Sequence, residues 1–359
     1  SLYRLVSTAM MPAGIRSIIE TLISAAWLAA RIVFALMLVL LGSLYRAYRR
    51  NAKLLQVPAS ELSLPLLAAR LSDLPYQVDN AELIERSIGT LLADSKLLHY
   101  QGQELMETNA VWFLCEGRTM PDSELAIFLV FRGTMSPTDA IHDVLFRPET
   151  APNGVKCHGG FLRAVREDKT LHDKLATLVC AKSYGAIYIM GHSLGGALAQ
   201  TIAGAGFLPK VLDCPLTIIS LGGPVAFYGQ PDPKLLDRIT SKARVLSIVN
   251  ANDIVPRLLG CPLSFTRSML ELFAANTNLK KRREQQVILD TLEQYQGFSE
   301  YELLFIHQGT AFHVPPKDRG LVLHLAEAIH FRAIADHLMY VDGVEAAAGV
   351  THWTPVASV

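Results

Sequence analysis

The order of apolar stretches along the chain predicts an α/β fold with a mainly parallel central sheet, preceded by N-terminal apolar helical sequence. From about Asn109 onward, short runs rich in Val, Ile, Leu and Phe alternate with segments of helical periodicity. The runs at 124–131 and 186–190 are almost continuously apolar, which is typical of strands covered on both faces. Such sheets form their sites at the carboxyl ends of strands, so we expect chemistry there.

The composition excludes two broad classes of protein. Of the 359 residues, 50% are hydrophobic and 18% are charged, and 33 basic residues balance 33 acidic ones. A chain this apolar does not remain disordered. No nucleic-acid partner is expected, because phosphate binding calls for a basic surplus that this chain lacks. Its five cysteines are widely spaced without a CxxC pair, which indicates neither a disulfide framework nor a zinc site.

Residues 1–56 are predicted to form a membrane-associating helical segment. Residues 22–45 contain a single charge, Arg31, over a length that suffices to cross a bilayer. The stretch is too long for a secretory signal peptide and lacks a small-residue cleavage site. A spanning or in-plane anchor is favoured over the alternative, a long buried helix, since the surrounding leucines offset the cost of one charge.

Basic residues directly after this stretch set the expected orientation. Residues 1–56 contain seven basic residues and one acidic residue, so residues 57–359 contain 26 and 32. Positive charges next to a membrane segment stay on the cytoplasmic side, and we expect the domain of residues 57–359 there.

The remaining elements are predicted in chain order. Residues 54–108 are expected to be helical segments broken by Pro58, Pro65 and Pro75. Strands are then expected at 110–117, 124–131, 186–190, 216–223 and 243–250, and helical periodicity covers 160–182 and 194–206. Residues 262–300 break this alternation and are predicted to be a helical insertion. Its LKKRRE run is interpreted as a solvated helix face, with a membrane-facing role as the alternative.

The segment Gly191-His192-Ser193-Leu194-Gly195 carries the strongest chemical signal. A G-x-S-x-G pattern between a strand and a helix is the context in which a tight turn projects a nucleophilic serine from the sheet. A serine hydroxyl needs a general base, and the base needs an orienting carboxylate. We therefore predict Ser193 as the nucleophile. The N–H of Leu194, the residue after it, is the expected donor to the oxyanion.

The partners of the serine follow it in the order Asp, His in this type of sheet. Asp253 stands just beyond the strand expected at 243–250, so its carboxylate should lie beside Ser193. Composition does not choose among the histidines that follow: His307, His313, His324, His330, His337 and His352. No metal or other cofactor is expected, because no ligand spacing is visible and this chemistry needs none.

Five motifs resemble those of the class 3, fungal-type lipases in their order and approximate spacing. They are FRGT at 131–134, KCHGGF at 156–161, GHSLGG at 191–196, LGGPVAF at 221–227 and NANDIVP at 250–256. The resemblance covers roughly residues 109–343 and implies an α/β-hydrolase fold. The family's D/S/A-H-x-x-Y segment matches residues 336–340, which makes His337 the base and leaves His330 as the reserve.

The same resemblance implies three further features. Thr134 would supply the second oxyanion donor, residues 135–144 would form a lid over the serine, and His307 would match a structural position in a late strand. The N-terminal apolar segment and the insertion near 262–300 depart from the small secreted fungal enzymes.

Together the residues and the resemblance predict a serine ester hydrolase that cleaves glycerolipids, namely mono-, di- or triacylglycerols, at a membrane surface. Phospholipase A-type cleavage and acyl transfer to an alcohol use the same residues and stay open. A catalytically silent lipase-like scaffold or lipid sensor is disfavoured, because Ser193, Asp253, His337 and Thr134 are all present. Head group, acyl-chain length and oligomeric state are left open.

Overall fold

The computed structural model describes part of the chain in detail. It covers residues 54–78, 80–102, 110–133, 148–181, 184–208, 212–229, 234–236, 240, 242–258, 295–296, 301–315, 319 and 332–350. The chain divides into two compact units, Ser1–Asn51 and Ala52–Val359, and every described residue belongs to the second. The expected anchor, Thr134, the expected lid and His330 lie outside the described residues. None of the helices within these ranges combines the length and the apolar character that a membrane crossing requires.

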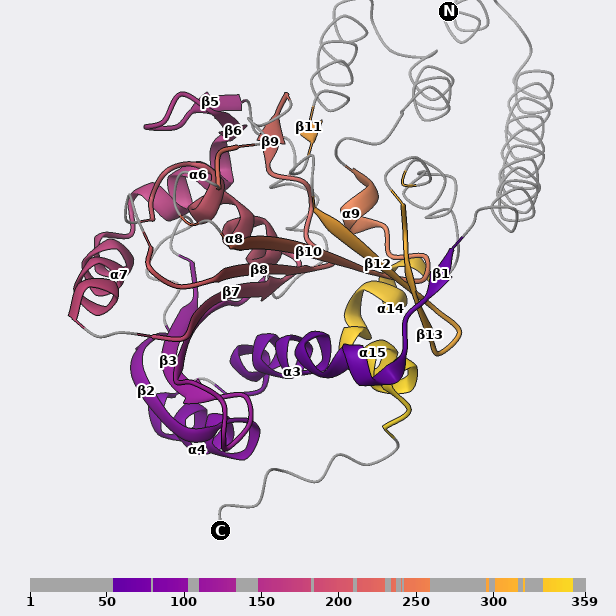
Figure 1. Ribbon diagram of the computed structural model, residues 1–359. Helices are drawn as coiled ribbons and strands as arrows, with labels where there is room; N and C mark the ends of the chain where they lie inside the picture. The colour runs from indigo at the N-terminus through magenta and orange to yellow at the C-terminus, as the bar shows by residue number, and fades with distance from the viewer. Residues whose placement is uncertain are drawn as a thin grey trace, which may run out of the picture. The chain divides into compact units, whose positions relative to one another are not determined.

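The described residues form a nine-stranded sheet in the order β1-β13-β12-β10-β8-β7-β4-β3-β2 (Figure 1). Its five central strands are parallel, namely β4 (Ala126–Phe131), β7 (Ala186–His192), β8 (Leu216–Leu221), β10 (Ala243–Asn250) and β12 (Glu302–His307). The edge strands are antiparallel: β2 (Ala93–Gln101) and β3 (Trp112–Arg118) at one edge, β13 (Thr310–His313) and β1 (Leu55–Gln56) at the other. The α/β prediction is confirmed, with a mixed, mostly parallel sheet.

Helices cover both faces of this sheet (Figure 1). One face packs against α6 (Gly159–Arg166), α7 (Lys169–Ala181) and α8 (Leu194–Gly204). The other packs against α3 (Ser63–Gln77), α4 (Ala81–Leu91) and α15 (Tyr340–Ala348). Neighbouring residues of β4 point to opposite faces, so Leu129 joins the first core and Phe128 the second. Every residue of β4 is buried, as its continuous apolar sequence predicts.

The N-terminal part of the domain differs from its prediction in two respects. Neither Pro65 nor Pro75 breaks α3, which contains both. Pro65 lies in the first turn, where its missing N–H has no acceptor within the helix. Residues 93–101, expected to be helical, form the edge strand β2. The register of β2 against β3 shifts between Ala93 and Lys96 and between Leu97 and His99. These irregularities remove the alternation by which a strand is recognised in a sequence.

The helical periodicity at 160–182 belongs to two helices rather than one. Asp168 separates α6 from α7, and its Oδ1 accepts a hydrogen bond from the N–H of Leu171, 2.9 Å away, at the start of α7. Its Oδ2 accepts a hydrogen bond of 2.6 Å from the indole N–H of Trp112 on β3. At this break, Asp168 therefore supplies hydrogen-bond acceptors to the N-terminus of α7 and to a buried indole. Helical periodicity alone does not reveal such a break.

A small second sheet has the order β11-β9-β6-β5. Its strands are β5 (Pro148–Thr150), β6 (Lys156–His158), β9 (Phe227–Tyr228) and β11 (Tyr295–Gln296). Only β11 comes from the segment predicted as a helical insertion, and its two residues pair with β9 as a strand instead of forming a helix. Backbone pairing over two residues has no periodicity to detect, so these two residues are not predicted as a strand. The rest of the predicted insertion lies outside the described residues.

Candidate active site

Ser193 lies in the turn where β7 ends and α8 begins. Its backbone angles are φ 57° and ψ −128°, a conformation that is strained for any residue other than glycine. Glycines on both sides make the turn possible. A Cβ added at Gly191 would lie 2.4 Å from the carbonyl carbon of Gly195, and one added at Gly195 would lie 2.3 Å from the carbonyl oxygen of Phe131. The backbone of the turn thus leaves no space for a side chain at these two positions.

Ser193, Asp253 and His337, the three residues predicted to form the triad, lie together. The distance from His337 Nε2 to Ser193 Oγ is 2.9 Å, and that from His337 Nδ1 to Asp253 Oδ1 is also 2.9 Å. Their exposed fractions are 2% for the serine, 0% for the aspartate and 3% for the histidine. If Nδ1–H donates to the carboxylate, Nε2 is free to accept the serine proton, which is the tautomer that base catalysis requires.

The Asp253 carboxylate has further donors. Its Oδ2 accepts a hydrogen bond of 2.6 Å from the hydroxyl of Tyr340, and its Oδ1 accepts one of 2.8 Å from the N–H of Val255. The same tyrosine oxygen accepts the N–H of Asn250 at 3.0 Å. Burial, followed by the charge of Asp253, raises the pKa of Tyr340 well above its usual value, so this residue stays a hydrogen-bond donor.

Two asparagines hold the histidine segment against the end of β10. The histidine lies on the short helix α14 (Ala333–Leu338). Asn252 donates to Asp336 Oδ2 from its backbone N–H at 3.1 Å and from its side-chain amide at 2.9 Å. The Asn250 amide donates to the backbone carbonyls of Asp336 at 2.9 Å and Met339 at 3.1 Å. The loop that supplies Asp253 therefore also fixes α14, and both asparagines belong to the NANDIVP motif.

A second line of hydrogen bonds approaches the site from α3. The Tyr76 hydroxyl accepts the N–H of Gly133 at 2.8 Å and lies 3.1 Å from His192 Nδ1. His192 Nε2 lies 2.8 Å from the backbone carbonyl oxygen of His337. Burial, followed by the neighbouring His337, lowers the pKa of His192 to about 4. Sequence reasoning assigned no role to either residue, and Tyr76 stands 116 positions before His192 without any motif around it.

The oxyanion-hole candidates are only partly described. Leu194 is the first residue of α8, and the N–H groups of a first turn have no acceptor within their helix, so its N–H is available to a ligand. Thr134 is outside the described residues, but Gly133 before it lies close to the elbow. A Cβ added there would lie 2.8 Å from the Cβ of Ser193. The chain leaving β4 therefore runs directly beside the nucleophile.

His307, which the family resemblance gave as a structural match, is described in the structure. It ends β12 and stacks on Phe305, with ring centroids 5.7 Å apart. The described part of the chain contains no group of three or more His, Cys, Asp or Glu side chains that could hold a metal ion.

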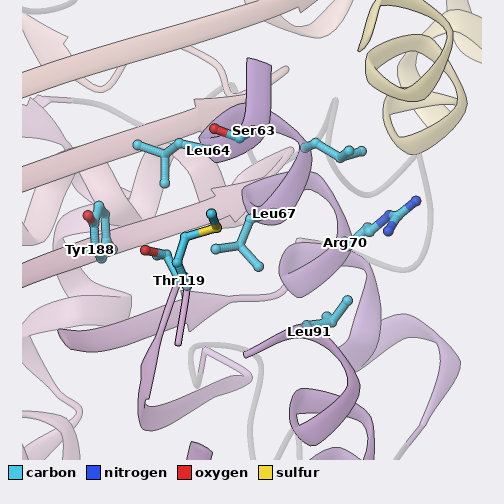
Figure 2. Close-up of a pocket in the computed structure, with 9 residues that line it drawn as sticks. Ser63, Leu64, Leu67, Arg70, Leu91, Thr119 and Tyr188 are labelled. Atoms are coloured by element: carbon cyan, nitrogen blue, oxygen red, sulfur yellow. The ribbon is translucent and has the colours of Figure 1, made fainter. Parts of the chain in front are cut away.

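A hollow of about 300 Å³ lies apart from this cluster, between α3 and the Thr119–Met120 turn (Figure 2). Its lining includes Leu64, Leu67 and Tyr188 but none of the three triad candidates. Arg70, at its rim, donates to Glu345 of α15 at 3.1 and 2.6 Å. The hollow thus contributes no group to the chemistry at Ser193.

Comparison with known proteins finds a family match within the chain. Residues 128–263 match the family described as lipase (class 3), and this span includes both Ser193 and Asp253. This region of the chain thus matches the class 3 lipase family. The prediction made from five short motifs is confirmed.

Individual lipases match different portions of the chain. It is 32% identical over 177 residues to a lipase from Rhizomucor miehei, covering 46% of this chain and 44% of that protein. It is 34% identical over 111 residues to a lipase from Rhizopus niveus, covering 29% and 28%. The aligned regions thus span less than half the length of these curated relatives.

The fold extends beyond those aligned regions. The structure of Lip2 lipase from Yarrowia lipolytica matches with a TM-score of 0.55 at 17% identity, covering 81% of this chain and 96% of that one. The Rhizomucor miehei lipase in its propeptide complex matches with a TM-score of 0.51 at 20% identity, covering 81% of both chains. At these identities, the matches establish the shared α/β fold.

Proposed function

We propose that this class 3 lipase hydrolyses acyl esters of glycerolipids through an acyl-enzyme formed on Ser193. The observation that carries the proposal is the hydrogen-bonded line from Ser193 through His337 to Asp253 at a strained strand-to-helix turn. A serine activated in this way attacks carbonyl carbon, which is the chemistry of acyl transfer.

The reaction has two halves. In the first, Ser193 Oγ bonds to the ester carbonyl carbon while His337 Nε2 takes its proton, and Asp253 stabilises the imidazolium that forms. The N–H of Leu194, together with Thr134, stabilises the negative oxygen. His337 then gives the proton to the departing alcohol. In the second half, the same histidine activates water, which releases the fatty acid and restores Ser193.

The surroundings of the base support a lipid substrate. Ile334, Leu338 and Met339, in and just after α14, are 54%, 61% and 40% exposed although their neighbour His337 is buried. Exposed apolar side chains beside a hydrolytic centre suit an acyl chain or a lipid surface better than a water-soluble ester. The named relatives are lipases, which favours acylglycerols within this class.

We further propose that residues 1–56 attach the enzyme to a membrane with its hydrolase domain on the cytoplasmic side. The support is the apolar stretch at 22–45 and the basic residues that follow it. Sedimentation with anionic vesicles tests the attachment by comparing the full chain with residues 52–359, a truncation that retains β1. Equal sedimentation of both would contradict it.

Labelling by a fluorophosphonate, which reacts with activated serines, tests the catalytic proposal. The wild type should be labelled, Ser193→Ala should not, and Ser87→Ala at a half-buried position of α4 serves as the matched control. Turnover on tri-, di- and monoacylglycerol and phospholipid emulsions then identifies the preferred substrate. A wild type that stays unlabelled where an ordinary serine esterase reacts would overturn the proposal.

A further inference from the structure

A continuous line of hydrogen bonds outside the triad joins three segments that meet at the site. It runs from the N–H of Gly133, after β4, to the Tyr76 hydroxyl, then to the His192 ring and on to the backbone carbonyl of His337. We propose that Tyr76 and His192 form a positioning relay that keeps His337 aligned with Ser193. This inference rests on the proposed function of that site.

The chemistry of the two ends fixes the direction of every bond in the relay. The Gly133 N–H can only donate, so the Tyr76 oxygen accepts there and directs its own proton elsewhere. The His337 carbonyl can only accept, so His192 Nε2 must carry a proton. In a neutral ring Nδ1 is then an acceptor, and it accepts a hydrogen bond from the Tyr76 hydroxyl. The relay therefore exists in one tautomer of neutral His192 alone.

The surroundings of His192 favour that neutral ring. Burial lowers its pKa, and the next largest influence is the nearby His337. The rings of the two histidines have centroids 4.7 Å apart. Among the described residues, the other titratable groups that face it are the Asp253 carboxylate and the rings of Tyr76 and Tyr340, whose centroids lie 5.7 and 5.3 Å away. A charged His192 would oppose the imidazolium that forms on His337 during proton transfer.

The geometry shows what the relay positions. His192 directly precedes Ser193, so its ring is fixed to the same turn as the nucleophile, and its Nε2–H holds the backbone of the residue that acts as base. Gly133 has no space for a side chain on this side, because an added Cβ would lie 2.4 Å from the Tyr76 oxygen. Nucleophile, base and the chain leaving β4 are thereby held at fixed mutual distances.

Substitution of either member of the relay tests this role. We expect Tyr76→Phe and His192→Leu each to lower kcat about tenfold to a hundredfold while KM changes by less than about twofold, because alignment and not substrate binding is lost. The double variant should be no slower than the slower single variant, since one break already interrupts the line. His192→Gln keeps a donor at the Nε2 position and should retain more turnover than His192→Leu. Tyr188→Phe on β7 removes a hydroxyl away from the site and should match the wild type.

Nitrogen NMR of ¹⁵N-histidine-labelled wild type provides a readout that does not depend on the variants folding. At neutral pH His192 should show a protonated Nε2 and an unprotonated Nδ1. A protonated Nδ1 would overturn the relay, as would wild-type kcat in both Tyr76→Phe and His192→Leu. Additive losses in the double variant would also reject it. An unlabelled wild type in the fluorophosphonate assay would instead overturn the proposed function, so the two failures are distinguishable.

Discussion

At the residue scale, the carboxylate of Asp253 has more partners than a minimal triad needs. Besides His337 it accepts hydrogen bonds from Tyr340 and from the N–H of Val255. Hydrogen bonds to a carboxylate favour its charged form and fix its orientation. Tyr340 makes a second hydrogen bond in addition to the one with Asp253, because its oxygen also accepts the N–H of Asn250.

Replacement of Tyr340 by Phe should therefore affect both stability and turnover. The variant leaves the Asn250 N–H without this acceptor, and we expect the free energy of unfolding to fall by about 1–3 kcal/mol. Asp253 would be less firmly oriented, and turnover should fall by roughly tenfold. Urea unfolding and steady-state kinetics measure the two effects. Tyr184→Phe, which loses a partly buried hydrogen bond to Glu116, is the control for activity, and equal turnover in both variants would contradict the expectation.

The buried His192 should make stability depend on pH in a defined window. Its pKa falls from an ordinary value of 6.5 to about 4 on folding. Between these values the unfolded chain binds a proton that the folded chain does not, so stability rises with pH from 4 to 6.5 and is lost as pH falls. The contribution is about 3 kcal/mol across this window.

Urea unfolding of the wild type and of His192→Gln at pH 4.5 and pH 7.5 checks this dependence. The glutamine does not titrate, so the difference in unfolding free energy between the two pH values should be smaller in the variant. Equal differences in the two proteins would show that another group dominates the acid response.

At the element scale, two helices contain glycines with opposite requirements. Gly195 lies in the first turn of α8, where an added Cβ would lie 2.3 Å from the carbonyl oxygen of Phe131 on β4. Gly89 lies within α4 on an exposed face, and the nearest atom to an added Cβ is a serine oxygen at 3.8 Å. The first glycine permits close packing, whereas the second only weakens its helix.

Substitution of each glycine by alanine should separate these two roles. Gly89→Ala should stabilise the protein by about 0.5–1 kcal/mol through helix propensity, without altering activity. Gly195→Ala should destabilise it by about 2 kcal/mol or more and abolish labelling of Ser193, because α8 must move away from β4. Thermal unfolding and fluorophosphonate labelling measure both. A Gly195→Ala protein with normal stability and labelling would contradict this account of the elbow.

At the scale of the whole molecule, Ser193 and its proposed base are closed off from solvent. Ser193 is 2% exposed and His337 is 3% exposed, so an acyl ester reaches them only after the protein around them rearranges. Ile334, Leu338 and Met339 remain exposed nearby. A lipid surface that binds these side chains stabilises the conformation of the protein in which they contact the lipid most.

Turnover of a short, soluble ester should therefore rise when lipid vesicles are added. Leu338→Ser should weaken this rise, because it removes an apolar contact with the surface while leaving the triad in place. Met120→Ser, in the turn after β3, replaces an apolar side chain of similar exposure, 65% against 61%, and should leave the rise unchanged. A rise of equal size in all three proteins would show that Leu338 does not contact the lipid.

Much of the site could be predicted because its residues lie at fixed places in local patterns. Gly191, Ser193 and Gly195 form a turn that only small flanking residues allow, and Asp253 follows directly after a buried strand. The continuous apolar runs also identified the central strands. Their burial on both faces requires apolar side chains at every position, so the pattern is visible without any partner.

Other features depend on contacts between distant parts of the chain. The edge strand β2 forms only because β3 pairs with it, and its irregular register conceals the pattern of a strand. Sequence spacing did not choose the general base among the histidines after Asp253. The resemblance to the family motif, and not composition, selected His337. Its place between Ser193 and Asp253, 144 and 84 residues away along the chain, depends on α14 packing against the end of β10.

By itself, then, the sequence determined the α/β class, the nucleophile turn and the family, because each rests on short stretches whose geometry is set locally. The tertiary structure decided which polar side chains surround those residues. Tyr76, 116 positions before His192, joins the site only once α3 has packed on the sheet, and Tyr340 reaches Asp253 only from the start of α15. Hydrogen bonds over such separations arise from the packing of whole elements, which no local pattern encodes.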